Sequence, residues 1–424
     1  MIRMDYSYQP RRDILCIDVK SFFASVESVK RRIHPLESYI VVMSNPDLEG
    51  GLVLAASPKV KEEYGIRTGS RRFEIPVHSK IEIVEPRMAL YIKVNLMINN
   101  LFKEFVAEED IHIYSIDESF LDVTRSHALY GSTEEIAKQI QKTIFQRLRL
   151  VTSIGIGDNP LLAKLALDNE AKRTQSQIAI WHYEDVPEKL WKIHPITNMW
   201  GIGGNTAKNL YRLGIDSVYS LSQYDVDALK RVHGVIGEQL FYHAHGIDHS
   251  VLSEKYTPHS KGYGKSQILK RDYVNQYEIE VVIREMADEV AARLRKHHAE
   301  TGVIHLSVSY SKDVLDKGFS RQMKIFPTSS NVKIIETCLQ IFRTHYNNQP
   351  VRQLAIRCGK IAYKKQLQLN LFETPEKTIH TEELEVVIDR IREKYGFSSL
   401  VHASSLTKGG TAIQRSGLVG GHKG

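Results

Sequence analysis

The hydrophobic positions of residues 13–190 follow two different spacings along the chain. Short apolar runs predict buried strands at residues 14–18, 40–43, 52–56, 111–115, 120–123 and 151–156. Helical spacing and capping residues predict helices at residues 25–32, 87–107, 132–148 and from about 161 onward. Because strands and helices alternate, we expect this part of the chain to form a sheet covered by helices.

The pattern changes near residue 193. Residues 196–250 predict short helices joined by glycine-containing turns, and the polar stretch at 250–261 is typical of a linker. Residues 262–362 then predict strand, long helix, two strands, helix and strand. This βαββαβ order is that of a compact unit with both helices on one face of its sheet. The remaining tail predicts one helix at 382–394 and a mobile, glycine-rich end.

Composition excludes several classes of protein. No apolar run among the 424 residues approaches the roughly 20 residues that a membrane-spanning helix needs, and the first residues lack the apolar core of a signal peptide. The three cysteines are too few and too far apart for a disulfide framework. We therefore expect a cytoplasmic, monomeric protein that does not associate with membranes.

The net charge of +7 is unevenly distributed. Residues 255–365 contain 20 Lys and Arg but only 10 Asp and Glu, so the rest of the chain is slightly acidic. A concentrated basic segment is typical of a surface that binds a polyanion such as nucleic acid. A solvated charged face is the alternative.

Three carboxylates stand where predicted strands end. Asp18 ends the first strand, and Asp117 and Glu118 lie in the turn before the strand at 120–123. Buried carboxylates need compensating cations, and Mg²⁺ prefers such hard oxygen ligands. A pair of metal ions can activate an attacking hydroxyl and stabilise the leaving oxygen of a phosphoryl transfer. Ordinary surface acids at strand ends are the alternative, and Asp122 is expected to support the turn.

Two adjacent phenylalanines, Phe22 and Phe23, follow Asp18 at the expected start of a helix. The N–H groups at a helix start can hold an anionic phosphate. A rigid aromatic ring beside a triphosphate would exclude a ribose 2′-hydroxyl. Both residues are therefore candidates for nucleotide binding, and packing in the core is the alternative, especially for Phe22.

The glycine-rich segment at 199–215 has the spacing of a helix-hairpin-helix. Gly201 and Gly203 permit a tight turn with close approach to a phosphate, and Lys208 would grip DNA without reading its sequence. An ordinary turn is the alternative, and residues 233–237 form a weaker second candidate. Further candidate phosphate contacts lie on the strands of the basic βαββαβ unit: Lys265, Lys270, Arg271, Arg321 and Lys324.

Three ordered motifs resemble those of the Y-family (translesion) DNA polymerases, nearest the bacterial UmuC/UvrX-like branch. They are Asp18-Val-Lys-Ser-Phe-Phe-Ala-Ser-Val-Glu27, Tyr114-Ser-Ile-Asp-Glu-Ser-Phe-Leu-Asp122 and Ser153-Ile-Gly-Ile-Gly-Asp-Asn-Pro-Leu-Leu-Ala-Lys-Leu-Ala166. The resemblance runs from about residue 13 to 362. It implies a multidomain α+β fold of right-hand type, with a ferredoxin-like palm (1–24 and 86–192), small fingers (25–85), a helix-hairpin-helix thumb (193–250), a linker (251–261), a βαββαβ little finger (262–363) and a tail (364–424).

The resemblance also implies roles for single residues. Asp18, Asp117, Glu118 and the backbone carbonyl of Val19 would hold two Mg²⁺ ions, and Phe23 would be the steric gate against ribonucleotides. Lys164 would contact the incoming triphosphate. Many family members carry a further basic contact in the fingers, but the aligned position here is Glu62. We expect Lys59 or Lys61 to replace that contact.

A peptide in the tail resembles the bacterial sliding-clamp binding motif, Gln-Leu-x-Leu-Phe. Its residues are Gln368, Leu369, Leu371 and Phe372, and an extended segment of this kind offers a polar anchor and apolar side chains to a groove on a partner. A strand packed on its own domain is the alternative.

Together these features imply an error-prone polymerase. It would copy damaged templates in the SOS response, with primer-template DNA, deoxynucleoside triphosphates and the sliding clamp as partners. Accessory mutagenesis proteins are further candidate partners. A catalytically inactive DNA-bound scaffold and a nucleotide cyclase with a similar palm are the alternatives. Intact carboxylates oppose the first, and the hairpin, basic unit and clamp peptide oppose the second.

Overall fold

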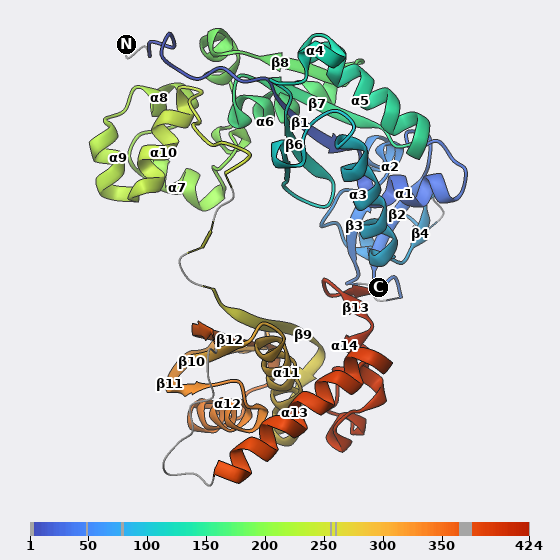
Figure 1. Ribbon diagram of the computed structural model, residues 1–424, viewed down its shortest axis with the longest axis vertical. Helices are drawn as coiled ribbons and strands as arrows, with labels where there is room; N and C mark the ends of the chain where they lie inside the picture. Colours follow the sequence, from blue (N-terminus) through green and yellow to red (C-terminus); the bar gives the residue numbers. More distant parts are fainter. Residues whose placement is uncertain are drawn as a thin grey trace. The chain divides into compact units, whose positions relative to one another are not determined.

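The computed structural model describes residues 4–47, 50–77, 80–254, 257–258, 261–363 and 375–423, with side chains described from 379 in the last range. The chain divides into two compact units (Figure 1). The first unit comprises Met1–Lys255 and His422–Gly424, and the second comprises Tyr256–Gly421. The division falls within the predicted linker. In the described residues no helix is both long and apolar enough to cross a membrane.

A five-stranded sheet forms the centre of the first unit. Its strands lie in the order β5-β6-β1-β7-β8, and the central strand β1 is antiparallel to both of its neighbours. The strands are β1 (Ile14–Val19), β5 (Ile111–Ile113), β6 (Glu118–Asp122), β7 (Thr152–Gly157) and β8 (Ile178–Trp181). Glu118 therefore begins a strand, whereas the sequence placed it in the preceding turn.

The two faces of β1 belong to two different cores. Leu15, Ile17 and Val19 pack with side chains from α1 (Phe22–Lys30), α3 (Met88–Phe102) and α5 (Thr133–Leu148). Ile14 and Cys16 pack on the opposite side, with α6 (Pro160–Asn169). Because both faces are buried, the strand is a continuous apolar run rather than an alternating one. The aspartate at position 18 is its only charged residue.

Two glycines of β7 allow α6 to lie directly on the sheet. A Cβ atom on Gly155 would come within 2.0 Å of the Ala163 carbonyl oxygen, and one on Gly157 within 2.4 Å of the Ala163 nitrogen. Real Cβ atoms do not approach backbone so closely, so this contact requires glycine at both positions. The close approach carries Lys164 of α6 to the sheet beside the carboxylates.

A small three-stranded sheet follows α1. Its order is β3-β2-β4, with β2 (Ile40–Ser44), β3 (Leu52–Ala56) and β4 (Glu82–Val84). The sequence did not predict β4, which has only three residues and pairs in parallel with the distant β2. The helix α2 (Pro58–Tyr64) follows β3, with its N-cap at Ser57.

The predicted helical region after residue 193 is confirmed. It contains α7 (Gly204–Arg212), α8 (Val218–Ser222), α9 (Val226–His233) and α10 (Val235–Ala244). Shorter helical elements of the first unit are α4 (His127–Tyr130), η1 (Arg72–Glu74), η2 (Glu108–Asp110), η3 (Ala171–Arg173), η4 (Tyr183–Asp185), η5 (Val186–Leu190) and η6 (Ile196–Asn198).

The second unit has the predicted βαββαβ order. The strands β9 (Tyr263–Tyr273), β10 (Ala299–Tyr310), β11 (Gly318–Thr328) and β12 (Val351–Tyr363) form a sheet in the order β11-β10-β12-β9. The helices α11 (Gln276–Lys296) and α12 (Asn331–His345) pack on this sheet around one core. Cys338 and Cys358 lie in that core as free thiols, like Cys16 in the first unit.

Within residues 375–421, the helix predicted at 382–394 is confirmed as part of a longer helix, and the glycine-rich end that we expected to be mobile contains helical and strand elements. This segment contains α13 (Pro375–Tyr395), η7 (Phe397–Ser399), η8 (Ala403–Leu406) and α14 (Ala412–Ser416), before the strands β13 (Leu418–Val419) and β14 (His422–Lys423). The buried Glu285 of α11 accepts 2.9 Å hydrogen bonds from the backbone N–H groups of Thr411 and Ala412. Because these contacts are hydrogen bonds from the backbone, they produce no hydrophobic periodicity by which the sequence could have predicted them.

Candidate active site

The pairing of β1 with β6 brings two of the three predicted carboxylates together. Asp18 lies directly opposite Glu118 in the antiparallel register, so both side chains are on one face of the sheet. Asp117 stands in the turn immediately before β6, where its carbonyl accepts a 2.9 Å hydrogen bond from the N–H of Val19. The Ser115 hydroxyl donates a 2.6 Å hydrogen bond to the Asp117 carboxylate. The sheet thus places all three acids at one end of β1.

Asp18 carries an incompletely compensated charge. Only 16% of its side-chain surface is exposed, and its nearest cation is the Lys172 ammonium at 3.5 Å. Burial raises the pKa of Asp18 to about 6, because Lys172 offsets only part of the burial and the neighbouring Asp117 and Glu118 add to it. A further cation beside Asp18 would therefore stabilise its charged form.

Glu118 is neutralised by Lys164 of α6, which packs on the same face of the sheet. The Lys164 ammonium lies 2.8 Å from one Glu118 oxygen and 3.0 Å from Asp168, and the Cys16 thiol donates to the other Glu118 oxygen at 3.1 Å. Burial lowers the proton affinity of Lys164, but Cys16, Glu118 and Asp168 together raise its pKa above the ordinary value. Lys164 is 7% exposed, so it acts here as a buried counter-charge.

The carboxylates of Asp18, Asp117 and Glu118 are suitable ligands for divalent metal ions, although they do not form a complete coordination site. Within the described ranges, no three acidic, histidine or cysteine side chains converge as a metal site. The Glu118 carboxylate is instead engaged by Lys164 and Cys16. Asp18 and Asp117 supply hard oxygen ligands, and the raised pKa of Asp18 marks a position where added positive charge is favourable. This donor set suits Mg²⁺ bound together with substrate phosphates.

Phe23, the predicted steric gate, packs against the buried Tyr91. Phe22 is 2% exposed and belongs to the core, whereas Phe23 is partly exposed. The Phe23 ring stacks on Tyr91 of α3, with centroids 4.4 Å apart and planes inclined by 15°. The Tyr91 hydroxyl donates a 2.9 Å hydrogen bond to the buried Glu27. Tyr91 thus supports the Phe23 ring, which stands five residues after Asp18 in the chain.

The two candidate lysines of α2 point in different directions. Lys59 pairs with Glu63, 3.7 Å away on the same helix, and both side chains are 40% exposed. Lys61 instead donates a 2.8 Å hydrogen bond to the hydroxyl of Ser21, the residue that precedes α1. Burial lowers the pKa of Lys61, while the charge of Asp18 opposes this change. Lys61 is therefore the α2 lysine whose charge interacts with that of Asp18.

Sequence reasoning missed one cation of this site. Lys172 follows α6 and lies 3.5 Å from Asp18 and 2.8 Å from Asp168, with 34% of its side chain exposed. Burial opposes its charge, but Asp18 and Asp168 raise its pKa. The spacing of Lys164, Asp168 and Lys172 at intervals of four residues was the signal, because it places the three on one side of a helix.

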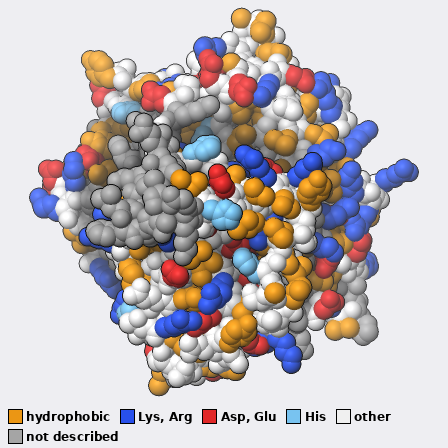
Figure 2. Space-filling model, turned by 60° about the horizontal axis from the view of Figure 1, so that its bottom comes forward, with side chains coloured by type: hydrophobic (Ala, Val, Ile, Leu, Met, Phe, Trp, Pro, Cys, Tyr) orange, Lys and Arg blue, Asp and Glu red, His pale blue; other side chains and the backbone are white. Residues whose placement is uncertain are grey.

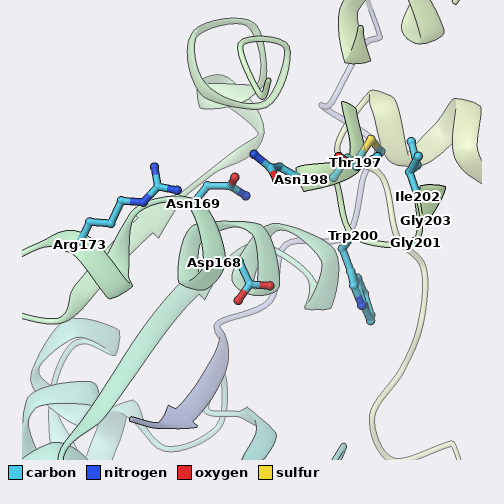
Figure 3. Close-up of a pocket in the computed structure, with 10 residues that line it drawn as sticks. Asp168, Asn169, Arg173, Thr197, Asn198, Trp200, Gly201, Ile202 and Gly203 are labelled. Atoms are coloured by element: carbon cyan, nitrogen blue, oxygen red, sulfur yellow. The ribbon is translucent and has the colours of Figure 1, made fainter. Parts of the chain in front are cut away.

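The predicted hairpin lies beside this group of charges. Gly201 has a φ of +91°, and α7 begins at Gly204 with Lys208 exposed on it. The Trp200 ring contacts Tyr114 edge-on with centroids 5.9 Å apart, and Tyr114 precedes the turn that carries Asp117. A cavity of about 540 Å³ separates the hairpin from the end of α6 (Figure 3). Its lining includes Gly201, Gly203 and Asp168.

The five basic candidates of the second unit do not share one face. Arg271 pairs with Glu278 at 2.6 Å. Lys265 pairs with Glu289 of α11 at 3.0 Å, on the helix side of the sheet. Arg321 lies in the same alternating row as Phe319 and Met323, which pack on the core. Lys324 lies in the opposite row, and Lys270 is exposed. On the face drawn in Figure 2, basic, acidic and hydrophobic side chains are interspersed. The clamp-like residues Gln368, Leu369, Leu371 and Phe372 lie outside the described residues.

Comparison with known proteins agrees with this geometry. The sequence profile of the impB/mucB/samB family matches residues 17–168, its C-terminal domain matches 260–371, and the IMS family HHH motif matches 183–215. UvrX of Bacillus subtilis (strain 168), a protein named for UV-damage repair, is 46% identical over 99% of this chain and 100% of its own length. DNA polymerase IV 2 of the same organism is 35% identical over 96% of this chain and 98% of its own.

The solved structures include one of similar fold. A Y-family DNA polymerase chimera of Dbh and Dpo4 superposes with a TM-score of 0.65 at 20% identity, covering 83% of this chain and 100% of the chimera. This match shows the same fold, with the palm, fingers, thumb and little finger that the motifs implied. With the family profiles matching more than half of the chain and full-length relatives above 30% identity, the chain belongs to the impB/mucB/samB family of Y-family DNA polymerases.

Proposed function

We propose that this protein is a translesion DNA polymerase that adds deoxynucleoside monophosphates to a primer 3′-hydroxyl on damaged templates. The observation that carries the proposal is the pairing of Asp18 with Glu118, beside Asp117, at a position with two partly buried lysines. Carboxylates that can hold metal ions, together with lysines that can contact phosphates, are suited to a reaction between a hydroxyl and a triphosphate. The family and its relatives named as polymerases support the same conclusion.

Two Mg²⁺ ions would be held by Asp18, Asp117, Glu118 and the Val19 carbonyl. Bound there, they would lower the pKa of the primer hydroxyl and neutralise the triphosphate. Lys61 and Lys172, rather than the buried Lys164, would contact the phosphates. Lys172 lies 3.5 Å from Asp18, the charge of Lys61 interacts with that of Asp18, and both lysines are partly open to solvent. Lys164 would keep Glu118 charged and in place.

The remaining parts of the chain would bind the nucleic acid. Phe23, stacked on Tyr91, would exclude a 2′-hydroxyl from the sugar position. Gly201, Gly203 and Lys208 would contact one strand of the duplex, and Lys270 and Lys324 would contact its backbone from the second unit. The peptide at 368–372 would recruit the polymerase to the sliding clamp. The small fingers, with three short strands, would leave room for a damaged base.

Primer extension with Asp117→Asn tests the proposal. We expect the unsubstituted protein to extend a primer with Mg²⁺, on undamaged and lesion-bearing templates, and the variant to lose extension while its affinity for DNA changes little. Asp122→Asn is the matched control, because Asp122 stands at the far end of the same strand, where its carboxylate accepts hydrogen bonds from Thr124. Extension by Asp117→Asn at the original rate would refute the metal assignment. Absence of extension by the unsubstituted protein on every template would favour a DNA-bound scaffold.

A further inference from the structure

Asp168 belongs to a chain of alternating charges beside the candidate metal ligands. One of its oxygens, Oδ1, lies 2.8 Å from the Lys172 ammonium, and the other, Oδ2, lies 3.0 Å from the Lys164 ammonium. Lys172 is in turn 3.5 Å from Asp18, and Lys164 is 2.8 Å from Glu118. Because Asp18 and Glu118 lie opposite each other in the β1–β6 register, the two lysines link Asp168 to both ends of that pair.

The end of α6 places Asp168 at the outer edge of this group. Lys164, Asp168 and Lys172 recur at intervals of four residues, and α6 ends one residue after Asp168. The Asp168 side chain is 34% exposed and lines the cavity of Figure 3 together with Arg173 and Gly203, whereas the Lys164 side chain is only 9% exposed. Asp168 is therefore an outer partner for lysines that also contact the inner carboxylates.

Both oxygens of Asp168 are engaged by lysines. These lysines hold its pKa below the ordinary value although burial acts in the opposite direction. Within the described ranges, no three acidic, histidine or cysteine side chains converge as a metal site that would include it. Asp168 therefore acts on Asp18 and Glu118 through Lys172 and Lys164, and not as a further ligand.

The two lysines and a divalent metal ion need the same carboxylate oxygens. Lys172 lies beside Asp18, and Lys164 engages Glu118. A carboxylate attracts a metal ion less strongly when an ammonium group already compensates its charge, because the interactions of all nearby charges add. Asp168 gives both ammonium groups a second partner outside the strands that carry the ligands. Its charge therefore offsets the competition between lysine and metal.

We propose that Asp168 is a positioning residue that reduces the competition of Lys164 and Lys172 with Mg²⁺ for the carboxylates. The inference rests on the proposed function, in which three carboxylates hold the metal ions. Those three, Asp168 and the two lysines together carry two negative charges, and only one would remain without Asp168. Asp168 thereby sets the Mg²⁺ concentration that the protein needs, although it contacts neither metal nor substrate.

Direct titration with Mn²⁺ tests this role on the full chain bound to primer-template DNA. The electron paramagnetic resonance signal of the free ion measures how much Mn²⁺ the complex binds. We expect Asp168→Asn to weaken Mn²⁺ binding roughly tenfold, because a negative charge near the site is lost. Lys172→Ala should strengthen it several-fold, because the cation beside Asp18 is removed. In the Lys172→Ala background, Asp168→Asn should weaken binding only about twofold, because one of the two lysines through which it acts is gone.

Primer extension provides a second readout and its controls. With Asp168→Asn, the Mg²⁺ concentration for half-maximal extension should rise by a similar factor, and excess Mg²⁺ should restore the rate, which it would not do for an unfolded protein. Asp168→Glu keeps the charge and should retain most of the affinity. Glu170→Gln is the matched control, because it removes a negative charge two residues away that pairs with Lys189 at 3.1 Å and accepts a hydrogen bond from Trp181.

Several outcomes would overturn the inference. Equal Mn²⁺ affinity for Asp168→Asn and the unsubstituted protein would show that Asp168 does not influence metal binding. A tenfold loss in both backgrounds would make Asp168 a direct ligand, and the same loss with Glu170→Gln would assign the effect to net charge alone. Weaker binding by Lys172→Ala would show that this lysine does not compete with the metal. If the affinities change as expected but the unsubstituted protein extends no primer, the role of Asp168 stands and the proposed polymerase function is refuted.

Discussion

Asp18→Asn should stabilise the metal-free protein while abolishing its activity. In the folded state burial raises the pKa of Asp18 to about 6 from the ordinary value of 3.8. An acid whose pKa is raised by folding holds its proton more tightly in the native state, so its contribution to stability is lost as pH rises from about 4 to about 6. The difference in proton affinity corresponds to roughly 3 kcal/mol, at about 1.36 kcal/mol per pKa unit.

Denaturant unfolding of the two proteins in EDTA measures this effect. At pH 8 the asparagine variant should exceed the unsubstituted protein in free energy of unfolding by up to roughly 3 kcal/mol, and the excess should shrink towards zero at pH 4. Groups remote from Asp18 titrate equally in both proteins, so the difference reports on Asp18 together with the lysines whose pKa values it raises. Added Mg²⁺ should stabilise only the protein that retains the aspartate.

Asp168→Asn is a control of opposite sign. Burial raises the proton affinity of Asp168, but Lys172 and Lys164 outweigh it and hold the pKa below the ordinary value. This acid therefore contributes stability above its unfolded pKa, and that contribution is lost as the pH falls. The variant should be less stable than the unsubstituted protein at pH 8 and should approach it at acid pH. If Asp18→Asn also lost stability at pH 8, burial of the Asp18 charge would not be unfavourable, and the reasoning would be refuted.

The other predictions concern substrate and partner binding. Phe23→Ala should raise incorporation of ribonucleotides, and Tyr91→Ala should do so to a lesser extent, because Tyr91 only supports the ring; unaltered sugar selectivity in both would exclude the gate. Lys172→Ala should raise the KM for the incoming nucleotide about tenfold while Lys59→Ala, whose target is an exposed ion pair, should leave it unchanged. A KM for Lys172→Ala equal to that of the unsubstituted protein would show that Lys172 does not contact the triphosphate. Phe372→Ala should weaken binding to the sliding clamp in a pull-down and leave synthesis without clamp intact; undiminished capture would reject the tail motif.

Local patterns in the sequence were sufficient to predict the order of strands and helices and to identify the three candidate carboxylates. The apolar run of residues 14–17 ending in Asp18 predicted a buried strand, and the alternation of residues 262–362 predicted the βαββαβ unit that the structure contains. Capping chemistry predicted the start of α5, where Ser132 and Glu135 form a capping box. These signals are readable because each depends on residues within one or two turns of one another.

Only the tertiary structure decided how charges pair around those carboxylates. Nothing in the sequence distinguished Lys59 from Lys61, whose roles separate because one side chain meets Glu63 and the other meets Ser21. The glycine contacts that press α6 onto β7 make Lys164 a buried partner of Glu118 and leave Lys172 beside Asp18. The cavity that joins Arg173 to Gly203 likewise exists only after palm and thumb have packed. Electrostatic energy depends on distances and burial set by residues far apart in the chain, and local sequence patterns do not encode those distances.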